Sequence, residues 1–274
     1  MGFGAPVTAV APPILNPRSP LRLAKKWLLP VVPFVIVLAL WWLVWYIGDF
    51  AIGVLPSPRL VLDSAIDRWD EFRGHIGASL QRLVWGFLVA AVTGVLLGLA
   101  AGLSKRIADF LGPLVTFMNA ISGIAWIPLA IAWFGVGTGM VVFIIWNASF
   151  FLIFLNVMLG VRLVPFHLEY GLLSLGASRA RVIRQVIVPG AMPYIMAGLR
   201  SGLGFGWRGL IAAELVGASS GLGFFIFEQQ EFNRADLIIA GALIIGTIGM
   251  AMDRLILAPL ERRTIERWGL VSTE

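Results

Sequence analysis

The sequence contains no cysteine and only two histidines, His75 and His167, which lie far apart. Without cysteine the protein forms neither a disulfide nor a thiolate metal site. Two distant histidines do not support a metal centre, and no cluster of His, Asp or Ser indicates acid–base or nucleophilic catalysis. The phosphate-binding pattern G-x-x-x-x-G-K-[ST] is also absent. We therefore predict no catalytic residue, no metal site and no bound cofactor in this chain.

Charge is scarce as well. Asp, Glu, Lys and Arg make up 13% of the residues, whereas 59% are hydrophobic and the mean hydropathy is +0.89. Such a composition is far from that of a soluble globular domain. The net charge of +6 is not concentrated in a compact basic domain, so we predict no nucleic-acid partner. Basic residues in loops on one side of a membrane explain the charge better.

The apolar residues fall into long runs. About 20 are needed for one helix to cross the hydrocarbon core of a bilayer. Clustered glycines from Gly135 to Gly139 divide one charge-free stretch into two runs, because they favour a turn. The predicted crossings are Trp27–Gly48, Leu83–Leu103, 110–134, 139–161, 193–216 and Leu237–Leu260. The sequence thus predicts an all-α, polytopic membrane protein with about six transmembrane helices over residues 27–260.

Loop charges predict the orientation. Lysines and most arginines flank the runs on the side that also holds both termini, which predicts a cytoplasmic N-terminus and C-terminus. The proline-containing tail 1–26 is predicted to be disordered, and residues 261–274 form a second cytoplasmic tail. On the other side, Asp63–Arg73 has apolar residues at helical spacing and is predicted to be a short interfacial helix.

Small residues recur every four positions along two runs, and such faces let helix backbones approach closely in lipid. They are Gly86, Ala90, Gly94, Gly98 and Gly102 in the second run, and Gly198, Gly202 and Gly206 in the fifth. We predict that the first stripe is a helix contact, either within the chain or with a second copy.

A polar segment, residues 162–190, separates the fourth and fifth runs and carries Arg179, Arg181 and Arg184. Placing such a segment between two apolar runs does not help membrane insertion, so we expect a partner outside the membrane to bind it. We call this segment the coupling loop. Within it, Ser174-Leu175-Gly176-Ala177-Ser178 and the later Val186-Ile187-Val188-Pro189 resemble the EAA motif of permease subunits of bacterial ABC importers.

In that family the motif forms cytoplasmic coupling helices that dock on a separate ATPase. The resemblance implies a type I ABC importer permease fold and places Tyr170 at the family's glutamate position, with Glu169 one residue earlier. One residue turns a helix by about 100°, so which of the two takes that role is open. The coupling residues it implies are Glu169, Tyr170, Gly171, Ser174, Leu175, Gly176, Ala177, Ser178, Arg179, Val188 and Pro189.

Other segments, among them His75–Arg82, Ala125–Ala130 and Ser219–Gly223, are similar to the nitrate/sulfonate/taurine/bicarbonate-type branch of these permeases. This resemblance covers residues 54–268. It implies a multi-pass protein of the bacterial inner membrane that imports a small, mostly anionic solute. The implied partners are ATPase subunits that hold ATP and Mg²⁺, an extracytoplasmic substrate-binding protein, the lipid bilayer and a second copy of the chain.

Polar and aromatic residues inside the runs are candidates for a translocation path, because ionisable groups in membranes are costly and often functional. They are Trp126, Asn147, Phe150, Asn156, Arg208 and Glu214. A structural alternative applies to several of them. Each asparagine could serve as an interhelical hydrogen-bonding group, and Arg208 and Glu214 could brace the outer end of the bundle. An ion-coupled secondary transporter is the alternative function, although the sequence contains no internal repeat.

Overall fold

The structure is a computed structural model that describes residues 31–48 and 53–259. Within these residues all regular elements are helices, which confirms the predicted all-α fold. They are α2 (Val32–Gly48), α3 (Pro58–Asp67), α4 (Trp69–Leu103), α5 (Lys105–Ala120), η1 (Gly123–Trp126), α6 (Ile127–Phe134), α7 (Thr138–Arg162), α8 (Phe166–Ser174), α9 (Arg179–Val182), η2 (Ile183–Ile187), α10 (Val188–Gly217), α11 (Leu222–Glu231), α12 (Ala235–Ala251) and η3 (Met252–Leu257). The predicted tails, 1–26 and 261–274, lie outside the described residues.

Four helices are long and apolar enough to cross a membrane: Trp69–Leu103, Thr138–Arg162, Arg179–Gly217 and Ala235–Leu255. They correspond to the second, fourth, fifth and sixth predicted runs. The first run is represented by α2, a shorter apolar helix without buried residues. The bent pair formed by α5 and η1–α6 provides a fifth crossing if it is counted as one. The predicted multi-pass all-α architecture is confirmed, and the described residues contain four or five helices of sufficient length where about six crossings were predicted.

The third run differs from its predicted form. Residues 110–134 are not one helix, because α5 ends at Ala120 and the chain bends by 92° before it continues through η1 and α6. Pro128 lies in the first turn of α6, where its missing N–H leaves no helical bond unmade. The helix is thus broken a few residues before this proline, and the proline begins the next helix.

The segment before the second run also differs. The predicted interfacial helix 63–73 is divided at Arg68, where α3 ends and α4 begins. Ser57 caps α3 through its Oγ atom, which accepts the N–H of Leu60 at 3.1 Å. Asp70 and Glu71 occupy the first turn of α4, where negative charge is favourable. The helix of the second run therefore starts at Trp69 and is 35 residues long.

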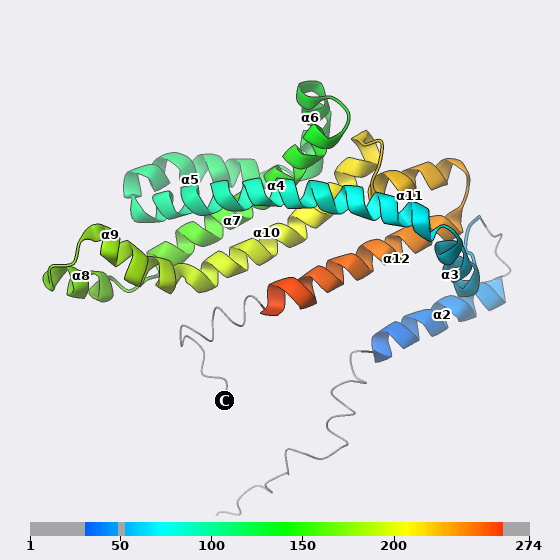
Figure 1. The fold of residues 1–274 in the computed structure, drawn as a ribbon, viewed down its shortest axis with the longest axis horizontal. Coiled ribbons are helices and arrows are strands. Elements are labelled where there is room, and N and C mark those ends of the chain that lie inside the picture. The colour runs from blue at the N-terminus through cyan, green and yellow to red at the C-terminus, as the bar shows by residue number, and fades with distance from the viewer. Residues whose placement is uncertain (1–30, 49–52, 260–274) are drawn as a thin grey trace, which may run out of the picture.

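The core is built around α7, which lies between α4 and α10 (Figure 1). The small-residue stripe of α4 faces α7 along its whole length. A Cβ atom added at Gly86 would lie 2.6 Å from Ile145, and one at Gly98 would lie 2.8 Å from Val157. The contact is therefore within the chain, as one of the two alternatives predicted.

The second stripe packs on another face of the same helix. Added Cβ atoms at Gly198 and Gly202 would lie within 3.0 Å of α7 side chains. The hydroxyl of Ser149 on α7 donates to the carbonyl of Gly202 at 2.8 Å, which links the two helices. Both stripes thus serve to bury α7, whose side chains such as Ile144, Ile153 and Phe154 are fully inaccessible.

The elongated bundle has two distinct ends. In Figure 1, α8 and α9 lie at one end, whereas α3 and α11 lie at the opposite end. Helices α4, α7 and α10 connect the two. We call the end that contains α3 and α11 the distal end (Figure 1). The coupling loop lies far from it.

The two glycine stripes lead to a direct test of packing. Replacing Gly98 with Ala would place a methyl group 2.9 Å from the backbone carbonyl of Phe154, and we expect a loss of about 1–3 kcal/mol in the free energy of unfolding. Gly77 lies on the same helix with open space around it, so Gly77→Ala should be neutral or stabilise by up to about 1 kcal/mol. Thermal unfolding of both variants in lipid nanodiscs measures the difference; equal melting temperatures would contradict this packing.

Candidate functional site

Helix α8 presents an exposed aromatic and aliphatic face. Phe166 and Tyr170 are 73% and 64% exposed, and Leu175 just beyond the helix is 86% exposed. The two rings are one turn apart and lie 6.4 Å from each other. On the other side, Leu172 and Leu173 pack against the core. A short helix with one partly buried apolar side and an exposed apolar side has the character of a docking element.

The glycine of the motif ends this helix. Gly176 has a φ of +83°, the left-handed conformation that glycine adopts without strain. The N–H of Gly176 donates to the carbonyl of Leu173 at 2.9 Å, and the N–H of Ala177 donates to that of Leu172 at 3.1 Å. These two bonds form a Schellman motif, which satisfies the last carbonyls of α8.

The next helix starts immediately. The Oγ atom of Ser178 accepts the N–H of Arg181 and caps α9. Residues Arg179–Gly217 then form one helix of 39 residues that contains the π-helical turn η2. This turn ends at Ile187, two residues before Pro189, whose missing N–H cannot close an ordinary helical bond. The motif Leu-Gly-Ala-Ser is thus a helix stop followed by a helix start.

Glu169 and Tyr170 face different surroundings. Tyr170 lies on the exposed face, whereas Glu169 lines a cleft of about 290 Å³ between α8–α9 and the ends of α4 and α7. Arg162 and Arg179 line the same cleft. Tyr170 thus lies on the exposed face of α8, and Glu169 lines the same cleft as two cationic residues of its own chain. Their assigned coupling roles stay predictions.

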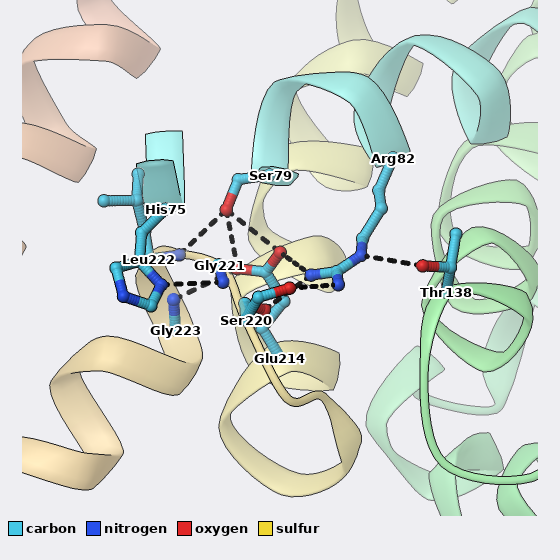
Figure 2. A network of polar contacts seen from close by, with 9 residues as sticks. All are labelled: His75, Ser79, Arg82, Thr138, Glu214, Ser220, Gly221, Leu222 and Gly223. Atoms are coloured by element: carbon cyan, nitrogen blue, oxygen red, sulfur yellow. Dashed lines mark hydrogen bonds and ion pairs between the residues drawn. The ribbon is translucent and has the colours of Figure 1, made fainter. Parts of the chain in front are cut away.

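The distal end contains a buried polar network (Figure 2). Glu214 of α10 is inaccessible to solvent, and its Oε1 atom accepts the Nη1 group of Arg82 of α4 at 2.9 Å. Ser79 donates its hydroxyl to the same carboxylate. Arg82 also donates to the backbone and hydroxyl oxygens of Ser220 and to the hydroxyl of Thr138. The Arg82–Glu214 ion pair and the other hydrogen bonds of Arg82 therefore join α4, α7, α10 and the loop before α11.

Backbone groups at the start of α11 complete this distal network. The N–H of Gly223 donates to Glu214 at 3.1 Å, that of Leu222 donates to Ser79 at 2.9 Å, and that of Gly221 donates to Nδ1 of His75 at 3.0 Å. An added Cβ atom at Gly221 would collide with the Glu214 carboxylate. Glycine is needed there, because the loop folds directly over the buried charge. The carboxylate also lies at the positive end of α11.

Three predicted path residues come together elsewhere. Trp126, Asn147 and Phe150 line one cavity of about 390 Å³ at the break between α5 and α6. Asn156 lies apart and donates to the carbonyl of Leu152 in its own helix at 2.8 Å. Arg208 is exposed, with its guanidinium 5.4 Å from the centre of the Phe205 ring. Neither asparagine makes the interhelical side-chain bond that the structural alternative proposed, within the described residues.

Sequence reasoning missed the partner of Glu214. Arg82 directly precedes the second charge-free run, so the sequence predicts that it lies outside the membrane-crossing segment. A signal for its role was the spacing of His75, Ser79 and Arg82. In a helix that begins before the run, this spacing puts the three side chains on one side. Glu214 therefore has the structural role that the bracing alternative predicted, and its role in a path stays a prediction. Asp253 of η3 pairs with Arg200 of α10 at 2.9 Å.

The buried pair gives a second prediction. Arg82→Met and Glu214→Leu each leave one buried charge without its partner, and each should cost about 3–5 kcal/mol in the free energy of unfolding. The double variant should cost at least about 1 kcal/mol less than the sum, because neither charge is then unpaired. A double-mutant cycle of thermal unfolding in lipid nanodiscs measures this coupling. Additive single effects would show that the pair does not act as a unit.

The sequence is similar to those of known transport proteins. It matches the family described as "Binding-protein-dependent transport system inner membrane component" over residues 94–264. The taurine transport system permease protein TauC of Escherichia coli K12 is 33% identical over 252 residues, which cover 88% of this chain and 90% of that protein. The putative aliphatic sulfonates transport permease protein SsuC of Bacillus subtilis 168 is 30% identical over 91% of both chains. Other matched relatives are named as bicarbonate and nitrate permeases.

The fold is also similar to that of solved transporters. A chain from a crystal structure of an amino acid ABC transporter with histidines aligns with a TM-score of 0.61 and 18% identity, covering 73% of this chain and 97% of that one. This similarity concerns the fold alone and agrees with the arrangement of the described helices. The sequence matches are broader and cover both ends of the bundle. The chain therefore belongs to the family of inner-membrane permease components of binding-protein-dependent transport systems.

Proposed function

We propose that this permease is the membrane-spanning subunit of an ATP-driven importer in which separate ATPase subunits bind the coupling loop. The proposal rests on the exposed apolar surface formed by Phe166 and Tyr170 of α8 and by Leu175 just after it. These side chains lie on a helix–turn–helix whose geometry is fixed by Gly176 and Ser178. A helix–turn–helix that is exposed and has a defined turn can transmit a movement of a bound partner to the helix that follows.

The route of transmission is the helix that follows. Arg179–Gly217 extends from the coupling loop toward the distal end over about 58 Å, at 1.5 Å per residue. Glu214 lies in its last turn and is bonded to α4 and α11. A displacement of α9 would therefore shift the contacts of the distal network. We propose that this movement alternates access to the path between the two sides.

The remaining partners follow from this scheme. The ATPase subunits hold ATP and Mg²⁺, so the permease catalyses no covalent step. An extracytoplasmic binding protein delivers the solute at the distal end, and two identical copies of the permease form the path. The basic residues at the coupling end, such as Lys105, Arg106 and Arg162, support a cytoplasmic location for it and for both termini.

The solute is proposed to be a small anion. The relatives are named for taurine, sulfonates, bicarbonate and nitrate, which share an acidic oxygen-bearing group. Uptake of these solutes by proteoliposomes that contain the permease, its ATPase and its binding protein tests the proposal. Uptake that requires ATP supports it. Uptake that persists without ATP and collapses with an ion gradient would instead favour a secondary transporter, although Glu214 is fully paired and is not a free carboxylate for ion coupling.

The coupling loop gives a third prediction. Valine at position 176 cannot adopt a φ of +83° without strain, so Gly176→Val should lower solute-stimulated ATP hydrolysis and uptake about tenfold while membrane insertion stays normal. Gly176→Asn should retain most activity, because asparagine tolerates this conformation. Gly171→Ala is the matched control, since Gly171 lies in the helix with open space around it. Wild-type coupling in the valine variant would rule out the docking role.

A further inference from the structure

Arg200 and Asp253 form an ion pair within the membrane-crossing part of the chain. Arg200 lies on the helix Arg179–Gly217, about 32 Å from its start and about 21 Å from Glu214 at 1.5 Å per residue. Asp253 lies on the crossing helix Ala235–Leu255. The Nε group of Arg200 donates to Oδ1 of Asp253 at 2.9 Å, and its Nη2 group donates to Oδ2 at 3.1 Å. The guanidinium thus holds both oxygens of the carboxylate.

This pair differs from the buried distal pair in its exposure. The side chains of Arg82 and Glu214 are 7% and 0% exposed, whereas those of Arg200 and Asp253 are 40% and 45% exposed. Charged groups are costly in contact with lipid and almost always face the interior of a bundle or a water-filled cavity. The exposed side of the Arg200–Asp253 pair therefore indicates a water-filled space along α10.

The local structure around the pair agrees with such a space. Gly198 and Gly202 of α10 face α7, and Arg200, between them in sequence, lies on the opposite side of the helix. Asp253 belongs to the π-helical turn η3, and single π-helical turns within longer helices are frequent at functional sites. The pair thus lies outside the packed contact between α10 and α7.

The two hydrogen bonds define what could take the place of Asp253. A guanidinium fork binds two oxygens of one acid group, and carboxylates, bicarbonate, nitrate and sulfonates all present such oxygens. An ion pair that water can reach contributes little net stability, because water and dissolved ions compete for both partners. A small oxyanion can therefore replace the Asp253 carboxylate while Arg200 stays paired.

We propose that Arg200 is an oxyanion-binding residue of the translocation path and that Asp253 is its exchangeable counter-ion. The inference rests on the proposed function and adds the residues that hold the acid group of the solute. Between transport events Asp253 compensates the charge of Arg200 inside the membrane. An arriving oxyanion displaces the Asp253 carboxylate into the water on the exposed side. The returning carboxylate releases the anion, so binding stays weak enough for passage.

A purely structural brace between α10 and η3 is the competing explanation, and Asp253→Asn separates the two. The permease–ATPase complex in phosphatidylcholine nanodiscs is heated in sodium nitrate or sodium methanesulfonate, with sodium chloride at equal ionic strength as the reference. An anion that binds the folded protein raises its melting temperature. Because Asp253→Asn removes the competitor of the anion, the same rise should occur at an anion concentration lower by about threefold or more. A brace predicts lower stability and an unchanged response to anions.

Variants of the arginine test the other half of the pair. Arg200→Gln should abolish the anion-dependent rise, and Arg200→Lys, which keeps the charge but lacks the fork, should require about tenfold more anion. Arg254→Gln is the matched control, because Arg254 is the exposed neighbour of Asp253, and it should respond like the wild type. Should Arg200→Gln fold poorly, the double variant Arg200→Gln/Asp253→Asn leaves no charge unpaired and carries the same expectation. An equal rise in the wild type and these arginine variants, or no rise in the wild type, would overturn the proposal.

Uptake by proteoliposomes separates this inference from the proposed function. Unchanged ATP-driven uptake in folded Arg200→Lys would overturn the oxyanion site and leave the importer intact. Failure of the wild type to take up any solute named for the relatives would overturn the proposed function, whereas anion-dependent stabilisation through Arg200 would still support the site. Uptake lowered about tenfold in Arg200→Lys, with normal basal ATP hydrolysis, supports both.

Discussion

The close approach of three helices is the constraint on which this structure depends. Glycine stripes on α4 and α10 pack on two faces of α7, leaving no room for a single added carbon at most positions of the contact. In a membrane there is no hydrophobic force between helices, so association relies on such packing and on interhelical bonds. The bond from Ser149 to Gly202 is one of these. The resulting three-helix core fixes the distance between the coupling loop and the distal end.

One continuous helix, Arg179–Gly217, begins in the coupling loop and ends at the distal network. It therefore links local sequence features of the loop to a remote site. Gly176 and Ser178 determine where α8 stops and α9 starts. The helix that begins there ends near Glu214, whose charge is satisfied by Arg82, Ser79 and the N-terminus of α11. A buried ion pair of this kind contributes little net stability but is costly to break. It therefore suits a role in fixing the relative positions of helices more than a role in stabilising the fold.

The cavity at the break shows the opposite property. There the indole N–H of Trp126 is buried without a partner among the described residues, whereas no buried polar side-chain atom of the distal network lacks one. Proteins commonly keep such local costs at functional sites. This cavity lies where the third run is interrupted, and residues of α5, η1, α6 and α7 line it.

By itself the sequence determined the membrane class, the all-α fold, most of the crossings, the coupling loop and its resemblance to a permease family. These features rest on local signals: apolar runs, glycine spacing, and stop and start residues such as Gly176 and Ser178. Only the tertiary structure decided which helix each glycine stripe packs against and where the third run breaks. It alone paired Glu214 with Arg82, which lies 132 residues away. The physical reason is that such pairing depends on how whole helices align in space, and no local pattern in one helix encodes the position of another.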